Sequence, residues 1–208
     1  MREDKRKQGP YTLADRTILR LNQKAIKLFE ASKRKLWVAK FDELNVIQEI
    51  KDLYAHLDNE NRKAFIRLFV DKYKEICGEE DDSLAEAYIA GLLSEPHPVT
   101  HYVYETEVLR KRDRLEEAIN STKEKEAEMD RGLRMWSQMT SWYTDFVSDG
   151  ANIEALKKMG VKKVVWVAQE DQLVCRECHD MDGNIYAIDK IPNKPHLHCR
   201  CYVIPYRK

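Results

Sequence analysis

The sequence has no long hydrophobic run and no net charge. No stretch approaches the ~20 consecutive apolar residues that cross a bilayer, and the N-terminus, Met1-Arg2-Glu3-Asp4-Lys5-Arg6, is too charged to precede the apolar core of a signal peptide. The 36 Lys and Arg residues are balanced by 36 Asp and Glu, which argues against a surface built throughout to coat nucleic acid. We therefore expect a cytosolic protein without a membrane partner.

Cysteines are few and are concentrated near the C-terminus. Four of the five lie between residues 175 and 201, as Cys175-Arg176-Glu177-Cys178 and Cys199-Arg200-Cys201. In a reducing cytosol, clustered cysteines are more often metal ligands or redox groups than disulfides. A Cys-x-x-Cys knuckle followed by a His/Cys cluster is the spacing that brings four soft ligands around one tetrahedral zinc ion. The sequence thus predicts a small C-terminal module with structural zinc as its cofactor.

The ligand spacing leaves more candidates than a four-coordinate site needs. The second pair of ligands must come from the segment Pro195-His196-Leu197-His198-Cys199-Arg200-Cys201. The two-residue gap between His196 and Cys199 lets both side chains converge, whereas His198 and Cys199 are adjacent and tend to point apart. Cys199 and Cys201 fall on the same face of an extended strand. The expected ligands are four of Cys175, Cys178, His196, Cys199 and Cys201, with His198 as a substitute for His196.

Helical periodicity dominates the first three quarters of the chain. Patterns run from a cap at Thr12, through 41–57 and 64–76 with a break at 58–61, and through 84–93 up to two prolines. The stretch 99–147 contains no proline and predicts one long helix, followed by a short helix over 152–159. β-branched and aromatic runs then predict three short antiparallel strands at 163–168, 183–188 and 201–205.

These patterns predict an α+β protein with a mostly helical N-terminal part and a small antiparallel-β, zinc-stapled C-terminal module. We place the helical region at 1–148, with 1–11 as a flexible tail, and the module at 149–208. A sheet this short has little core of its own, so a metal ion would supply stability that apolar burial does not.

The C-terminal residues carry a resemblance to a known family. Trp166, Asp171, the Cys175-x-x-Cys178 knuckle, Asp182-Gly183-x-x-Tyr186 and Pro195-His196-x-x-Cys199-Arg200-Cys201 resemble, in order and spacing, the C-terminal signature of the bacteriophage Mu protein F-like head morphogenesis family. These are minor head proteins of tailed phages. The similarity covers about the last sixty residues. It departs where the family usually has His-Pro-x-Cys-Arg-Cys, because Leu197-His198 stands in that gap here.

The resemblance implies a minor capsid protein that acts in head assembly and is not an enzyme. Such a protein is expected in the virion, in the head interior or at the portal vertex, after assembly in the host cytoplasm. Its implied partner is the portal protein, with the major capsid protein, the scaffolding protein and packaged DNA as further candidates, and a role in genome delivery is also implied. The basic N-terminal region, with twelve Lys/Arg against four acidic residues between Arg2 and Lys40, suits DNA or an acidic portal surface.

Three other functions compete with a head protein. A zinc-ribbon nucleic-acid reader could use Arg176, Arg200 and Arg207, but Glu177 and Asp180 are among the acidic residues that offset this charge. A zinc-bearing ββα-metal nuclease needs a helix after its hairpin, whereas the sequence ends seven residues after Cys201. A zinc deaminase needs His-x-Glu, which the sequence lacks.

Overall fold

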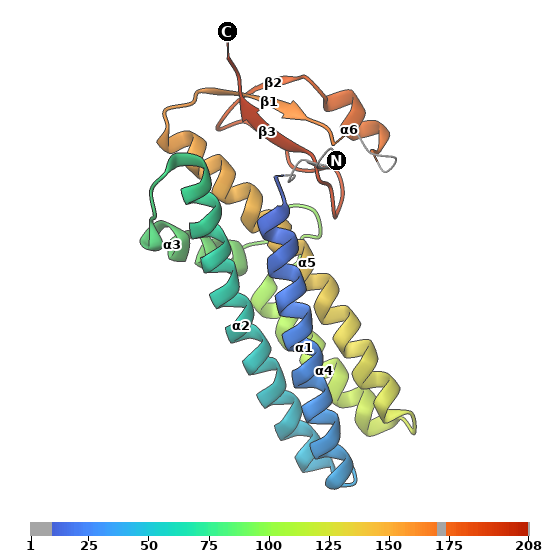
Figure 1. Cartoon of the computed structure of the whole chain (residues 1–208). Coiled ribbons are helices and arrows are strands. Elements are labelled where there is room, and N and C mark those ends of the chain that lie inside the picture. The colour runs from blue at the N-terminus through green and yellow to red at the C-terminus, as the bar shows by residue number, and fades with distance from the viewer. Residues whose placement is uncertain (1–9, 170–173, 208) are drawn as a thin grey trace, which may run out of the picture.

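The computed structural model describes residues 10–169 and 174–207. Long helices form an elongated bundle, and a small sheet with one short helix caps one of its ends (Figure 1). The elements, in chain order, are α1 (Thr12–Val38), α2 (Glu43–Cys77), α3 (Asp82–Ser94), α4 (Tyr104–Ser121), α5 (Lys125–Lys158), β1 (Lys163–Val167), α6 (Arg176–Met181), β2 (Ile185–Ala187) and β3 (Tyr202–Pro205).

The bundle forms around one apolar core, because α1, α2, α4 and α5 each bury a stripe of large side chains at helical spacing. Phe29, Phe65 and Trp136 are among its almost fully buried members, and Tyr54 meets Trp136 edge to face at 5.5 Å. Gly78 ends α2 in the left-handed conformation, with φ at 82°, and donates its N–H to the Lys74 carbonyl.

The three strands form one antiparallel sheet in the order β2-β1-β3. Val164 pairs with Tyr186 on one side and with Pro205 on the other. The predicted α+β fold, with a helical body and a small antiparallel module that contains the Cys/His cluster, is confirmed. Among the described residues, no helix combines the length and apolar character that crossing a bilayer requires.

The expected boundary at 148/149 lies inside α5. This helix continues to Lys158, so the short helix predicted at 152–159 is its last part. Ala151 and Ala155 belong to the bundle core, whereas Leu156 packs into the module. One continuous helix therefore serves both parts of the molecule.

The predicted break at 58–61 is wrong, because α2 runs through it without interruption. Asn61 is buried, and its amide donates to the Tyr104 hydroxyl at 3.1 Å and the Thr140 hydroxyl at 2.9 Å. Asparagine disfavours helix interiors because its side chain competes for backbone hydrogen bonds. Here two hydroxyl groups from other helices accept the hydrogen bonds of the Asn61 amide, so the helix continues.

The single long helix predicted over 99–147 is also wrong. The chain turns between α4 and α5, where Thr122 is extended and its hydroxyl accepts from the Glu124 N–H. The turn lets α4 and α5 pack side by side, and both contribute to the core through Ile119 and Met129. Burial of both helices against α2 outweighs the local preference for an uninterrupted helix.

The expected flexible tail at 1–11 is contradicted at its end. Residues 1–9 lie outside the described part of the chain, but Tyr11 is 1% exposed. It caps α1 one residue before the predicted cap, Thr12, and its side chain reaches α5 and the segment before β3. Tyr11 is therefore a core residue.

Candidate metal centre

The candidate ligands come from two segments that lie far apart in the sequence. Cys175 caps α6 with its thiol, because the Cys178 N–H donates to Sγ of Cys175 at 3.3 Å. This bond folds the Cys-x-x-Cys segment into a knuckle whose two sulfur atoms share one side. His196, Cys199 and Cys201 lie on the segment that leads into β3.

Their ligand atoms form two overlapping groups that share Cys178. Cys175, Cys178 and His196 form one group, and Cys178, Cys199 and Cys201 form the other; within each group all ligand atoms lie within 4.8 Å of one another. Sγ of Cys178 is 3.4 Å from Sγ of Cys199 and 3.6 Å from Nε2 of His196. Thiolates around one tetrahedral metal lie about 3.8 Å apart, because each is about 2.3 Å from the ion. The cluster could therefore hold a metal ion.

The thiols share a site from which water is largely excluded. Cys178, Cys199 and Cys201 are buried, whereas Cys175 and His196 are partly exposed. Burial, reinforced by the neighbouring thiols, raises the pKa of Cys178, and burial also raises the pKa of Cys199. The Cys178 N–H lowers the pKa of Cys175. A divalent cation would offset the cost of placing several thiolates together, since metal binding displaces their protons.

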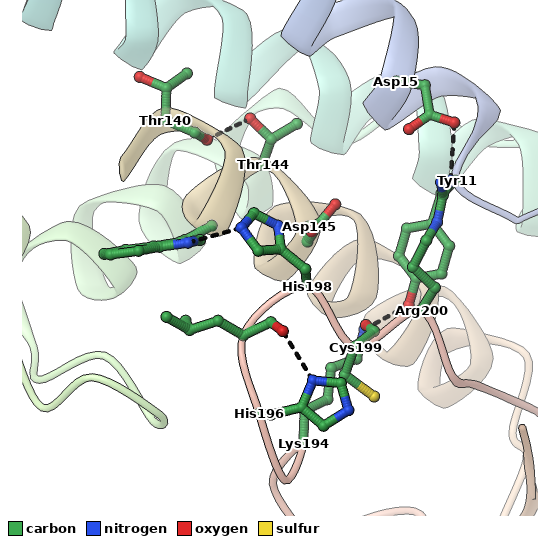
Figure 2. Close-up of polar contacts among 12 residues, drawn as sticks. Tyr11, Asp15, Thr140, Thr144, Asp145, Lys194, His196, His198, Cys199 and Arg200 are labelled. Atoms are coloured by element: carbon green, nitrogen blue, oxygen red, sulfur yellow. Dashed lines mark hydrogen bonds and ion pairs between the residues drawn. The ribbon is translucent and has the colours of Figure 1, made fainter. Parts of the chain in front are cut away.

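His198 lies close to the cluster but is turned toward α5 (Figure 2). Its Nε2 accepts from the Trp142 indole at 3.0 Å, and its Nδ1 lies 3.8 Å from a carboxylate oxygen of Asp145. Its backbone φ of 57° is in the left-handed region, which helps to direct the ring away from the neighbouring Cys199. Among the described residues, the group of ligand atoms includes His196 and does not include His198.

A buried polar network, which the sequence reading missed, fixes the ligand segment to the helical body. Nζ of Lys194 pairs with Asp149 at 2.5 Å and donates to the Cys199 carbonyl at 2.7 Å. The Tyr11 hydroxyl lies 2.6 Å from Oδ1 of Asp149 and 2.9 Å from the Cys201 carbonyl oxygen. We call this the Tyr11–Asp149–Lys194 network. It holds the backbone of two candidate ligands.

The network is buried, and burial shifts the pKa values of its acidic groups. Burial raises the pKa of Asp149 although the Lys194 ammonium opposes the shift, and burial followed by the Asp149 carboxylate raises the pKa of Tyr11. Beside it, Arg200 pairs with Asp15 of α1 at 2.8 Å and lies over the Tyr11 ring (Figure 2). The N-terminus of α1, the C-terminal third of α5 and the ligand segment thus form one charged junction.

Three other residues of the family signature lie at or beside β1; Trp166 belongs to the module core, whereas Asp182 and Gly183 are exposed. The Asp182 carboxylate accepts from the Ala168 N–H at 2.7 Å, Gly183 adopts a φ of 75° at the turn, and Trp166 is 2% exposed. Asp171 lies outside the described residues. No local sequence pattern marks Asp182 as a contact of Ala168, the residue that follows β1.

Comparison of the chain with protein-family models, curated proteins and solved structures finds no match. The chemistry of the site is therefore inferred from its candidate metal ligands alone. Five candidate ligands exceed the four positions of a tetrahedral ion, and the cavity among them has a volume of about 60 Å³. Such a closed site suits a structural metal better than a catalytic one, which keeps an open position.

Proposed function

We propose that the metal is zinc and that it is structural. Thiolates and imidazole are the ligand set of structural zinc sites, whereas Mg²⁺ and Ca²⁺ prefer oxygen ligands. The donors here are four thiols and the His196 imidazole. In the described part of the module, the core comprises eight buried residues, three of which are cysteines. A metal bonded to these cysteines would hold a core that apolar contacts alone would leave weak.

We propose further that the protein is a minor head protein of a tailed phage, bound at or near the portal and carried into the procapsid. The observation that carries this proposal is the convergence of the Cys175/Cys178 knuckle with His196, Cys199 and Cys201, the elements of the head-morphogenesis signature. In this role the bundle offers docking surfaces to the portal, and the stapled module gives a rigid end. The protein would assemble in the host cytoplasm and remain in the virion, where it could assist genome delivery.

A structural, non-catalytic role agrees with the charges around the module. Three of its cations have acidic partners: Arg200 pairs with Asp15, Lys194 with Asp149, and Arg176 approaches Asp180 at 3.9 Å. A surface that neutralises nucleic-acid phosphates needs cations free to replace counterions. The cavity of about 60 Å³ is also far smaller than the ~300 Å³ or more that small-molecule sites occupy.

The genetic setting and the assembled particle test the head-protein proposal. We expect a portal gene beside the gene for this chain, and co-expression of the two proteins should yield a complex of portal ring and minor protein. Imaging of heads assembled with this chain should place it at the portal vertex. A gene neighbourhood without head genes, or a portal ring that purifies without this chain, would overturn the proposal and leave the zinc assignment intact.

A further inference from the structure

The outer face of α1 carries an unusual apolar stripe. Leu19, Ile26 and Trp37 are 59%, 48% and 66% exposed. Leu19 and Trp37 are 18 residues apart, which is five full helical turns, and Ile26 lies about two turns beyond Leu19, so the three side chains share one side over about 27 Å. In Figure 1, α1 runs along the outside of the bundle with this length of helix uncovered by α3 or α4.

Two more exposed apolar residues lie near the end of α1. Val38 is 82% exposed, and Leu44, on the first turn of α2, is 78% exposed. Five of the eleven exposed large hydrophobic residues in the described part of the chain therefore lie in α1 or the first turn of α2. Gln23, Glu30 and Lys33 lie between the three large side chains on the same side of α1, so Leu19, Ile26 and Trp37 form a row of separate apolar anchors. Anchors repeated along one side of a helix are the pattern by which helices dock on one another.

A row of cations flanks the stripe on one side. Arg16, Arg20, Lys27 and Arg34 are exposed and lie roughly 60–100° around the helix from Leu19. None of the four forms an ion pair with a residue in the described ranges 10–169 and 174–207. By contrast, Lys24, Lys33 and Lys35 of the same helix are paired with Glu60, Glu30 and Glu49.

The positive charge extends into the groove between α1 and α2. This groove has a volume of about 370 Å³, and Arg20 and Lys63 contribute to its lining. Its two acidic residues are already engaged, Glu60 with Lys24 and Asp71 with Arg67. The groove therefore adds cations without available carboxylates to the same side of α1.

We propose that this face of α1 docks an amphipathic α-helix of a partner protein, whose apolar ridge is flanked by carboxylates. The stripe matches the ridge of a helix laid along it, and the cation row gives electrostatic complementarity with acidic side chains. A nucleic acid would use the cations but would leave Leu19 and Ile26 without a partner. The inference concerns the helical body, goes beyond the head-protein proposal and does not depend on the zinc site.

Three defined probes test this surface on the full-length, metal-loaded protein. The first is a 25-residue helical peptide with leucines along one face and glutamates flanking them. The second is the same peptide with lysines in place of the glutamates, and the third is a 20-base-pair DNA duplex. We expect the glutamate peptide to bind in a titration followed by fluorescence anisotropy, and the lysine peptide to bind at least ~10-fold more weakly.

Two surface variants separate the apolar and charged contributions. Leu19→Gln/Ile26→Gln/Trp37→Gln should weaken binding of the glutamate peptide at least ~10-fold. Arg20→Glu/Lys27→Glu/Arg34→Glu should exchange the preference, so that the lysine peptide becomes the tighter ligand. The matched control, Leu109→Gln/Arg114→Glu, changes exposed residues of α4 and should bind like the unaltered chain. All changed residues are exposed or half-buried, and far-UV circular dichroism checks that each variant is folded.

Three results would overturn the inference. One is equal affinity of the glutamate peptide for the unaltered protein and both α1 variants, and another is equal binding of the two peptides by the unaltered protein. The third is tight DNA binding that falls in the charge variant and is unchanged in the apolar variant, which would assign the face to nucleic acid.

Discussion

The helical body and the C-terminal module fold by different means. Among the residues that the structure describes, the bundle core joins thirty buried hydrophobic residues, whereas the module core contains eight, three of them cysteines. The three strands of the module are three to five residues long, and so small a sheet is at most marginally stable alone. Apolar packing therefore suffices for the body. The module core is too small to rely on it, so the Cys/His cluster, which could hold a metal ion, and the junction with the bundle would supply the remaining stability.

The junction is correspondingly polar. Lys194, Asp149 and Tyr11 meet where the body and module touch, and α5 crosses between them. Two carbonyls of the ligand segment, those of Cys199 and Cys201, are held there. Loss of a bound metal or loss of the junction should therefore each disorder the module. Neither should unfold the part of the helical bundle that lies away from the module.

Removing the knuckle thiols should have the largest effect. Cys175→Ser/Cys178→Ser removes two of the candidate ligands, and we expect bound zinc to fall from about one equivalent to none, since structural zinc contributes roughly 10–16 kcal/mol to small folded modules. Elemental analysis measures the metal. Hydrogen exchange should show that the backbone amides of β1, β2 and β3 lose their protection. The amides of α2, and those of α5 before residue 145, should keep theirs.

The matched control is Cys77→Ser, because Cys77 lies in α2 and its thiol bonds only to nearby backbone carbonyls among the described residues. It should retain full zinc content. Equal zinc in the double variant and the control would contradict the metal centre.

Breaking the junction should have the next largest effect. Lys194→Met leaves the buried carboxylate of Asp149 without its cation, which typically costs about 3–5 kcal/mol. Urea unfolding measures the free energy, and hydrogen exchange should report the loss first in the module. Adding Asp149→Asn to this variant removes the unpaired charge and should restore part of the stability. A double variant no more stable than Lys194→Met would contradict this account.

Much of this comparison could be anticipated from the sequence. Apolar periodicity predicted the helical body, β-branched runs predicted all three strands, and spacing predicted the Cys175/Cys178 knuckle beside Cys199 and Cys201. These features depend on neighbours within a few residues, where chain geometry limits the choices.

What failed depends on contacts between distant residues. Asn61 remains helical because Thr140 and Tyr104 satisfy its amide, and neither is near in sequence. Tyr11 and Lys194 are separated by 183 positions, yet their side chains hydrogen-bond. The ring of His198 is directed by Trp142, 56 residues earlier. Local patterns give no information about such partners.

Acid should weaken the body through His97, which is fully buried. Its Nδ1 accepts from the N–H groups of Val99 and Thr100, and burial lowers its pKa from 6.5 to about 4. The unfolded chain therefore binds more protons between these values, so stability is complete above pH 6.5 and falls as pH drops toward 4. The loss should reach about 3 kcal/mol, at 1.36 kcal/mol per pKa unit.

The difference between the unaltered chain and His97→Asn isolates this effect. Asparagine retains an acceptor near the position of Nδ1 but does not titrate, so its stability should change less between pH 7 and 4.5. Acid also protonates metal ligands, but equally in both proteins, and the difference cancels that contribution. His56→Asn, at an exposed position of α2, is the control and should keep the original pH profile. Parallel profiles for all three proteins would contradict the role of His97.

The smallest predicted effect separates the two histidines. His196→Ala should weaken zinc binding roughly 10–100-fold rather than abolish it, since Cys175, Cys178, Cys199 and Cys201 could still supply four ligands. His198→Ala should leave affinity within about threefold, because its Nε2 is engaged by Trp142. Cobalt substitution distinguishes the cases: the His196 variant should gain thiolate-to-metal absorption as a fourth sulfur replaces nitrogen, and the His198 variant should keep the original spectrum. The opposite pattern would make His198 the ligand, and the module would then have to release Trp142 whenever it binds metal.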